Sequence, residues 1–331
     1  MKKIICITLA LLMLLASLSL VACNNDNADD QTTLKFGMGV YTNVSKASNA
    51  EADVNGQGKY AATVAAVLVD ADGKVVACDL DTADITVEYT ADGKAIANES
   101  FLTKYELGDS YNMKTYGGAA KEWYEQADAF EGVVAGKTLA EIKALVAEAD
   151  KGTDEVIAAG CTIMVNEFVK AIEKAINNAA DSNATANDTV KLGIYTEQTC
   201  KDAADEKEGQ NKLETTIFAA AVDANGKIVA ASSDCVQVTF TFDASGASTY
   251  DLTKAVASKK EAGDAYGMKA YGGAAKEWYE QAAAFNAACI GKTASDVASL
   301  MGEDNYGNAD VKAAGCTILV NGFVKAANKI A

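Results

Sequence analysis

The chain has 331 residues, no histidine, no proline and a formal net charge of −17 at pH 7. Without histidine, a histidine-based catalytic triad, histidine-ligated zinc or iron and haem attachment through CxxCH are excluded. The negative charge argues against nucleic acid as a partner, and it favours solubility or attraction to a cationic partner.

Residues 1–22 have the pattern of a secretory signal peptide. Two lysines precede an apolar run that ends in L-V-A before Cys23. This ending matches the lipobox of lipoprotein signal peptidase and favours cleavage and lipidation of Cys23, although the run is nearly long enough to remain as an anchor helix. A diacylated cysteine holds a protein on a membrane without a transmembrane helix. We therefore expect a lipid-anchored protein on the extracellular face of the cell membrane.

The chain also contains an internal repeat. Residues 116–126 read YGGAAKEWYEQ, and the same eleven letters return at 271–281, an offset of 155 residues. The same offset aligns AAGCTIMVNEFVKA with AAGCTILVNGFVKA, which predicts two tandem homologous domains. The predicted parts are a polar, flexible tether at 23–32, a first domain at 33–176, a small-residue linker at 177–189 and a second domain at 190–331.

The first half of each copy has the pattern of β-strands. Alternating β-branched residues flank Asp72-Gly73 in the first copy and Asn225-Gly226 in the second, which predicts a hairpin in each. Further strands are expected at 34–42 and 190–196.

The second half of each copy predicts helices. Apolar side chains recur at helical spacing from Ala119 to Phe130 and predict one buried face. A T-x-x-E capping box at 138–141 marks the start of a shorter helix. A last helix is expected to begin near Asn166 or Asn321. The predicted fold class is α+β, with an antiparallel sheet followed by packed helices in each domain.

The segment A-A-G-C-T precedes the last helix of each copy. Its residues are Gly160, Cys161 and Thr162 in the first copy and Gly315, Cys316 and Thr317 in the second. A glycine two residues before a threonine permits a sharp turn and the close approach of a bulky group. The following helix, capped by Asn166 or Asn321, would point its N-terminus at that group and attract a phosphate. Alternatively, the small residues only pack a loop against the helix.

The A-G-C-T segment resembles the S-G-A-T acceptor of FMN-binding domains that are modified by an ApbE-type flavin transferase. Together with the lipobox, the DxDGK hairpin and the ELGDxYxMK and KEWYEQ blocks, it resembles the flavinylated lipoproteins of Gram-positive extracellular electron transfer, the pheromone lipoprotein A type. The resemblance covers the signal and both repeats. It implies that Thr162 and Thr317 each carry FMN through a phosphoester, with Gly160, Cys161, Gly315 and Cys316 beside the cofactor.

The chain departs from the family motif at three places in each copy. Ala159 and Ala314 replace its serine, Cys161 and Cys316 replace its alanine, and Val156 and Val311 replace its aspartate. The nearest acids, Glu155 and Asp310, lie one residue further back. The core of a small residue, glycine, a small residue and threonine is kept.

The aromatic residues and thiols near these segments have two interpretations each. Trp123, Tyr124 and Tyr116, with their counterparts Trp278, Tyr279 and Tyr271, would either stack on a flavin ring or pack in the core. For the tryptophans, a place on the apolar helix face favours the core. The thiols of Cys161 and Cys316 would either tune the flavin or behave as small buried apolar groups.

The resemblance implies a surface lipoprotein that relays electrons from the membrane to extracellular acceptors through covalent FMN in both domains. Such a protein is an electron carrier more than a turnover enzyme, and no residue is assigned a catalytic role. Its implied partners are the flavin transferase, a quinone-linked dehydrogenase as membrane donor and the extracellular acceptors, and only the lipid anchor contacts the membrane. The alternative is a non-enzymatic surface module that binds a ligand or partner through its two repeats and gains avidity from them.

Overall fold

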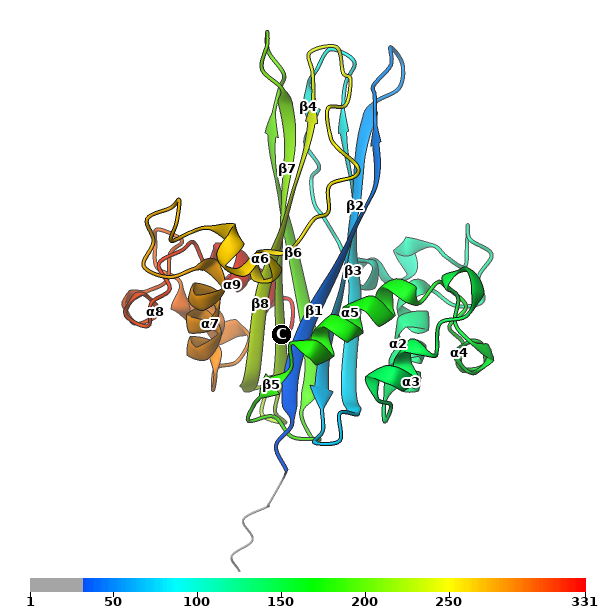
Figure 1. Cartoon of the computed structure of the whole chain (residues 1–331), viewed down its shortest axis with the longest axis vertical. Helices are drawn as coiled ribbons and strands as arrows, with labels where there is room; N and C mark the ends of the chain where they lie inside the picture. Colours follow the sequence, from blue (N-terminus) through cyan, green and yellow to red (C-terminus); the bar gives the residue numbers. More distant parts are fainter. Residues whose placement is uncertain (1–31) are drawn as a thin grey trace, which may run out of the picture. The chain divides into compact units, whose positions relative to one another are not determined.

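The computed structural model describes residues 32–331, which form one compact unit. The predicted signal peptide, Cys23 and the tether up to residue 31 lie outside the described residues. Each repeat contributes three long antiparallel strands followed by helices, so the predicted α+β class is confirmed (Figure 1). Among residues 32–331, no helix has the length and apolar sequence that crossing a bilayer requires.

The first repeat builds a five-stranded sheet in the order β4-β3-β2-β1-β5. Its strands are β1 (Lys35–Ser48), β2 (Gly56–Val69), β3 (Val75–Tyr89), β4 (Ala95–Ile96) and β5 (Ala180–Asp181). Its helices are α1 (Lys104–Leu107), α2 (Trp123–Val134), α3 (Leu139–Lys143), α4 (Asp154–Ala159) and α5 (Asn166–Asn177), with the 3-10 turns η1 (Gly108–Tyr111) and η2 (Glu148–Asp150). The short β5 falls in the segment predicted as the linker and pairs with the start of β1.

The second repeat builds a three-stranded sheet in the order β6-β7-β8. Its strands are β6 (Thr189–Lys201), β7 (Gly209–Val222) and β8 (Ile228–Phe242). Its helices are α6 (Lys259–Ala262), α7 (Trp278–Cys289), α8 (Ala309–Ala313) and α9 (Asn321–Asn328), with the 3-10 turns η3 (Gly263–Tyr266) and η4 (Ser295–Leu300).

Both predicted hairpins are present. In the turn between β2 and β3, the Asp70 carboxylate accepts hydrogen bonds from the backbone N–H groups of Asp72 and Lys74 at 2.9 and 2.8 Å. Gly73 has a φ of 76°, a left-handed conformation that glycine adopts at little cost. The turn between β7 and β8 repeats this arrangement around Asp223. The outer strands continue well beyond the predicted ends, to Ser48 in β1 and Lys201 in β6.

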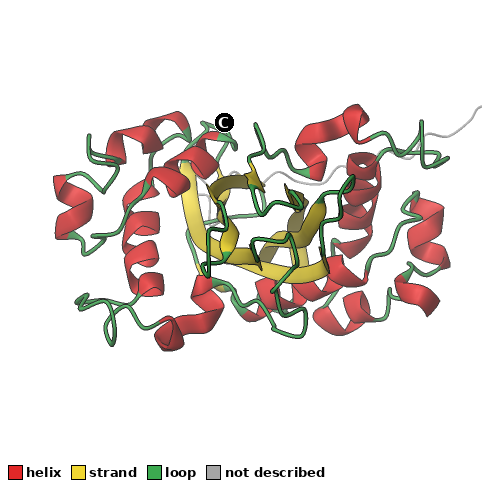
Figure 2. Ribbon diagram, turned by 90° about the horizontal axis from the view of Figure 1, so that it is seen from above, coloured by secondary structure: helices red, strands yellow, loops and turns green. Residues whose placement is uncertain are grey.

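The two sheets share one hydrophobic core. Met38 and Val64 of the first sheet lie in the same buried cluster as Ile217 and Val236 of the second. The Tyr60 hydroxyl donates a buried hydrogen bond to Thr215 of the other repeat. Viewed from above, the strands lie in the middle of the molecule with helices on both sides (Figure 2). Each repeat therefore relies on the other to cover the inner face of its sheet.

Helices cover the outer face of each sheet and form one further core per repeat. In the first repeat Trp123 of α2 packs edge-on against Phe168 of α5, with ring centroids 5.7 Å apart. Trp278 and Phe323 repeat this pair at 5.7 Å. Helix α5 lies close to β1 because Gly39 is present, since a Cβ there would collide with the α5 backbone. The tryptophans thus pack in the core.

Two helix starts differ from the sequence prediction. Helix α2 begins at Trp123, so Ala119 lies in a loop, because the Glu122 carboxylate bonds to loop N–H groups and caps the helix with Glu125. Asn166 is the first residue of α5, and its N-cap is Val165, which makes no side-chain hydrogen bond. The predicted asparagine cap is therefore wrong, also for Asn321, where Val320 is the N-cap. The capping box at 138–141 is confirmed.

Candidate functional site

The A-A-G-C-T segments form the same turn in both repeats. Helix α4 ends at Ala159, and Gly160 follows with a φ of 104°; Gly315 has a φ of 100°. The N–H groups of Gly160 and Cys161 donate to carbonyls of the last helical turn at 3.0 and 3.1 Å, which terminates the helix. A side chain at Gly160 would also collide with the Lys121 side chain. The glycine is therefore required by its φ, whereas the lysine side chain could move to make room.

A buried glutamine holds each threonine. The backbone N–H and the hydroxyl of Thr162 both donate to Oε1 of Gln126, at 2.8 and 3.0 Å. Thr317 makes the same two bonds to Gln281, at 2.8 and 2.9 Å. The Gln126 amide is itself fixed, since its Nε2 donates to the Lys121 carbonyl at 3.0 Å. Each threonine is an exposed residue whose hydroxyl donates to the glutamine.

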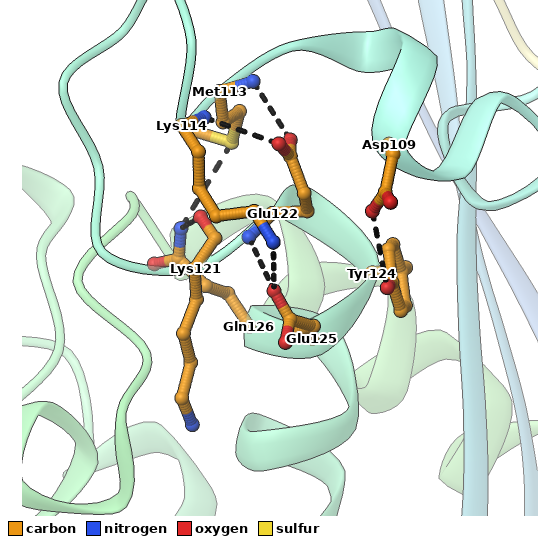
Figure 3. A network of polar contacts seen from close by, with 8 residues as sticks. All are labelled: Asp109, Met113, Lys114, Lys121, Glu122, Tyr124, Glu125 and Gln126. Atoms are coloured by element: carbon orange, nitrogen blue, oxygen red, sulfur yellow. Dashed lines mark hydrogen bonds and ion pairs between the residues drawn. The ribbon is translucent and has the colours of Figure 1, made fainter.

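The repeated KEWYEQ block supports this turn. The buried Glu122 carboxylate accepts from the backbone N–H groups of Met113 and Lys114 at 2.8 and 3.3 Å, and the Glu122 N–H donates to Glu125 at 2.8 Å (Figure 3). The Tyr124 hydroxyl donates to Asp109 at 3.3 Å. The conserved letters of the repeat are thus the scaffold that fixes the loop before α2 and the threonine turn.

A lysine ammonium lies beside each threonine turn. Nζ of Lys121 donates to the Ala159 carbonyl at 3.4 Å, and Nζ of Lys276 donates to Ala314 at 3.1 Å. Within residues 32–331 neither lysine forms an ion pair with a carboxylate. A positive charge is therefore free to meet an anion at this turn.

A pocket adjoins each threonine turn, and we call the two cavities the threonine pockets. Their volumes are about 270 Å³ in the first repeat and about 370 Å³ in the second. Equivalent residues line both: Lys104, Tyr111, Met113, Trp123, Asn166 and Phe168 in the first, and Lys259, Tyr266, Met268, Trp278, Asn321 and Phe323 in the second. Thr317 lines the second pocket directly, and Ile163 and Met164, which follow Thr162, line the first.

One lysine lies over the aromatic walls of each threonine pocket. Nζ of Lys104 is 5.3 Å from the centre of the Tyr111 ring and 5.8 Å from the Trp123 ring. Lys259 lies 5.4 and 5.7 Å from the corresponding rings. Such distances permit cation–π attraction. Each pocket therefore combines flat aromatic surface with a cation.

The acid that pairs with this lysine differs between the repeats. Lys104 pairs with Asp84 of β3 at 3.4 Å, whereas Lys259 pairs with Glu214 of β7 at 3.3 Å. Glu214 lines its pocket and Asp84 does not. The second threonine pocket also has Cys235 where the first has Thr82. Each pocket is lined by two carboxylates in all, so the two sites differ in where these acids lie and in the polarity at this one position.

The cysteines predicted beside the cofactor point into the core. Cys161 and Cys316 are buried, and burial raises the pKa of the Cys161 thiol to about 11. The same cause raises the pKa of Cys316. Both are protonated at neutral pH and behave as small apolar groups. All six cysteines between residues 32 and 331 are free thiols.

The candidate aromatic residues lie in different surroundings. Trp123 is buried, yet its ring forms part of a threonine pocket wall, and Trp278 does the same. Tyr116 and Tyr271 are 85% and 91% exposed and line neither pocket. Tyr124 and Tyr279 bond to aspartates of the preceding loop.

The residues that sequence reasoning missed are Lys121, Gln126 and Lys104, with their counterparts Lys276, Gln281 and Lys259. A signal was available for the glutamine, because Gln126 and Gln281 each stand 36 residues before the threonine that they bind. No protein-family model, curated protein or solved structure matches the chain.

Proposed function

We propose that this chain is an extracellular electron carrier, held on the cell surface by a lipid on Cys23, with one FMN esterified to Thr162 and one to Thr317. The observation that carries the proposal is the twofold occurrence of an exposed threonine beside a pocket with aromatic walls. FMN would supply reversible uptake of electrons, and the residues of the chain would bind and orient it.

The surroundings of each threonine suit a phosphate. The ammonium groups of Lys121 and Lys276 lie at the two turns and form no ion pair in the described part of the chain. A phosphodiester on Thr162 would take the place of the hydroxyl proton, and Gln126 would still accept the Thr162 N–H. The turn would therefore keep its shape after modification, with charge-assisted bonds from the lysine to the new anion.

The threonine pockets suit a flat heteroaromatic ring. Trp123 and Tyr111 offer aromatic surface in the first pocket, and Lys104 places a cation over both rings. The volumes of about 270 and 370 Å³ are near the lower end of ligand pockets, roughly 300–1,000 Å³. Part of the ring would stay exposed, as exchange of electrons with a partner requires.

Attachment needs a flavin donor and a transferase. In the balanced step, the threonine oxygen forms a bond to the phosphorus of the FMN half of FAD, and the bond from that phosphorus to the bridging oxygen breaks. AMP leaves with that oxygen, and the hydroxyl proton passes to a base of the transferase. No atom is oxidised or reduced in this step. The functional partners are a quinone-linked dehydrogenase on the membrane and acceptors outside the cell.

The decisive experiment is co-expression of the chain with an ApbE-type flavin transferase, followed by intact mass and in-gel flavin fluorescence. We expect two FMN adducts, of which one disappears in Thr162→Val, one in Thr317→Val and both in the double variant. Thr199→Val is the matched control, because Thr199 is an exposed threonine on β6 outside both pockets. Absence of any adduct, with the transferase active on a known substrate, would overturn the proposal.

A further inference from the structure

A separate cavity of about 510 Å³ lies between the repeats, and we call it the Lys260 cavity. One wall consists of β8, Lys260 of α6 and the α7 residues around Asn286. The other comes from the first repeat, with Phe36 and the segment from Asn178 to Asn183 at the end of α5. None of these residues lines a threonine pocket. The cavity is therefore a second, independent place for a ligand.

Lys260 is a cation with unused hydrogen-bonding capacity in this cavity. Its Nζ donates to the Ser232 hydroxyl at 3.0 Å, and within residues 32–331 it forms no ion pair. Asp234, the nearby acid, is already engaged, because one oxygen accepts the N–H groups of Cys235 and Lys260 and the other accepts the Ser258 hydroxyl. Two of the three ammonium protons remain for a ligand. Burial lowers the pKa of Lys260, and an anion there would relieve this cost.

The remaining lining is suited to hydroxyl groups and to a small apolar face. Asn183 and Asn286 offer amides. The Asn286 oxygen accepts a hydrogen bond from Ser233, whereas the Asn286 NH₂ group donates to no protein acceptor in the described part of the chain. Asp181, the acid in the lining, is an exposed residue, as Asn183 is. Ala283, Ala287 and Ile290 lie at helical spacing with Asn286 and add an apolar strip to the lining. Amides, one carboxylate and an apolar strip together match the surface of a sugar ring.

The first repeat shows that the fold does not require this chemistry. At the equivalent positions Tyr105 stands for Lys260, Asp79 for Ser232 and Glu131 for Asn286. The backbone contact at this position is the same in both repeats. The N–H of Tyr105 donates to Asp81, and the N–H of Lys260 donates to Asp234. The scaffold therefore tolerates either set, and the cation and amides of the Lys260 cavity are an additional feature of the second repeat.

We infer that the Lys260 cavity binds a small hydroxylated carboxylate of the uronic-acid class, with the carboxylate on Lys260 and sugar hydroxyls on Asn183 and Asn286. One ammonium group balances the single charge of a carboxylate, whereas a phosphate monoester carries about −1.5 to −2 charges at pH 7. This inference stands independently of the flavin, because the cavity shares no residue with the threonine pockets.

The test is isothermal titration of the purified chain with D-glucuronate and with D-glucose, its neutral counterpart. We expect glucuronate to bind and glucose to bind at least about ten-fold more weakly, the ratio that one charge-assisted contact provides. Lys260→Gln should weaken glucuronate binding by about ten-fold or more, and Lys260→Arg should retain most of it. Lys254→Gln is the matched control, since Lys254 is exposed and lies outside the cavity.

Three outcomes would overturn the inference. Glucuronate and glucose binding equally, Lys260→Gln binding glucuronate as the unsubstituted chain does, or no glucuronate binding at millimolar concentration would each do so. Tryptophan fluorescence of every variant establishes that it is folded. If Lys260→Gln does not fold, the ratio between the two sugars and the result for Lys260→Arg still decide the question.

Discussion

The two repeats agree where they hold the threonine and differ where they face each other. Thr162 with Gln126 and Thr317 with Gln281 have matching bonds to within 0.1 Å. At the contact between repeats, however, the first has Asp79 and Glu131 where the second has neutral residues. The residues at this contact, which we call the flank of each repeat, therefore differ between the copies, whereas the threonine turn is the same in both. This pattern indicates that the turn has the same role in both copies, whereas each flank has a role in one copy only.

The acidic flank of the first repeat is an electrostatic cost that the second repeat does not have. Burial, and then repulsion among the acids, raises the pKa of Asp79 to about 7 and that of Glu131 to about 9. Their oxygens accept from the N–H groups of Leu192 and Leu80, both at 2.8 Å. Within residues 32–331 no group of acids, histidines and cysteines is arranged to hold a metal ion. The raised pKa values favour the protonated form of Glu131 at neutral pH and that of Asp79 in acid.

The largest expected effect tests whether the repeats depend on one core. Phe240 of β8 is buried, and its ring packs on Gly58 of the first repeat, where a Cβ would collide with it. Phe240→Ala should lower the free energy of unfolding by about 3–5 kcal/mol. Each repeat has one tryptophan, so Trp278→Phe and Trp123→Phe backgrounds report the first and the second repeat separately. Both reporters should shift together in urea; a shift confined to the second repeat would contradict a shared core.

The next effect concerns pH and the acidic flank. Since the folded pKa values of Asp79 and Glu131 exceed the unfolded values of about 4, their contribution to stability is full below about pH 4 and falls as pH rises. It is lost once the pH passes about 7 for Asp79 and about 9 for Glu131. The chain should thus unfold more easily at pH 9 than at pH 5. Glu131→Gln should raise the free energy of unfolding at pH 8 by about 1–3 kcal/mol.

Urea titrations at pH 5 and pH 8 measure this difference. Glu155→Gln is the control, because Glu155 forms an exposed ion pair with Lys137 that contributes at most about 1 kcal/mol. If Glu131→Gln had the same effect at both pH values, the carboxyl group would not be titrating between them.

A smaller, local effect should follow removal of the glutamine. Gln126→Leu leaves the Thr162 N–H without its acceptor, which costs about 1–3 kcal/mol of local stability. Gln281→Leu should do the same at Thr317. Hydrogen exchange of the threonine and cysteine amides should accelerate in the substituted repeat alone. Acceleration in both repeats from one substitution would show that the turns are not independent.

The smallest effect concerns the cysteines of the turn. Cys161→Ala and Cys316→Ala remove a buried sulfur and should each lower the free energy of unfolding by about 1 kcal/mol. Flavin attachment in the transferase assay should be unchanged, since both thiols point away from the threonine and into the core. Loss of the adduct in a variant that still folds would instead place the thiol in the recognition of the turn.

Much of the local structure follows from nearby residues in the sequence. The hairpin turns at Gly73 and Gly226 and the capping box at Thr138 were predictable, because each depends on residues within four positions of one another. The start of α2 was not. Glu122 reaches back nine residues to Met113, and that contact draws Ala119 out of the helix. Propensity alone extends a helix through such a segment, whereas a competing side-chain bond ends it.

By itself, the sequence determined the duplication, the fold class and the identity of the repeated threonine, since all three are patterns along one chain. Only the tertiary structure decided what surrounds that threonine. Gln126 is 36 residues away, and the lysine and rings of the pocket come from α1, η1 and α2. The structure also decided that two sheets share one core, because burial of a strand's inner face depends on which surface packs against it. The Lys260 cavity likewise depends on the tertiary structure, because its walls come from both repeats.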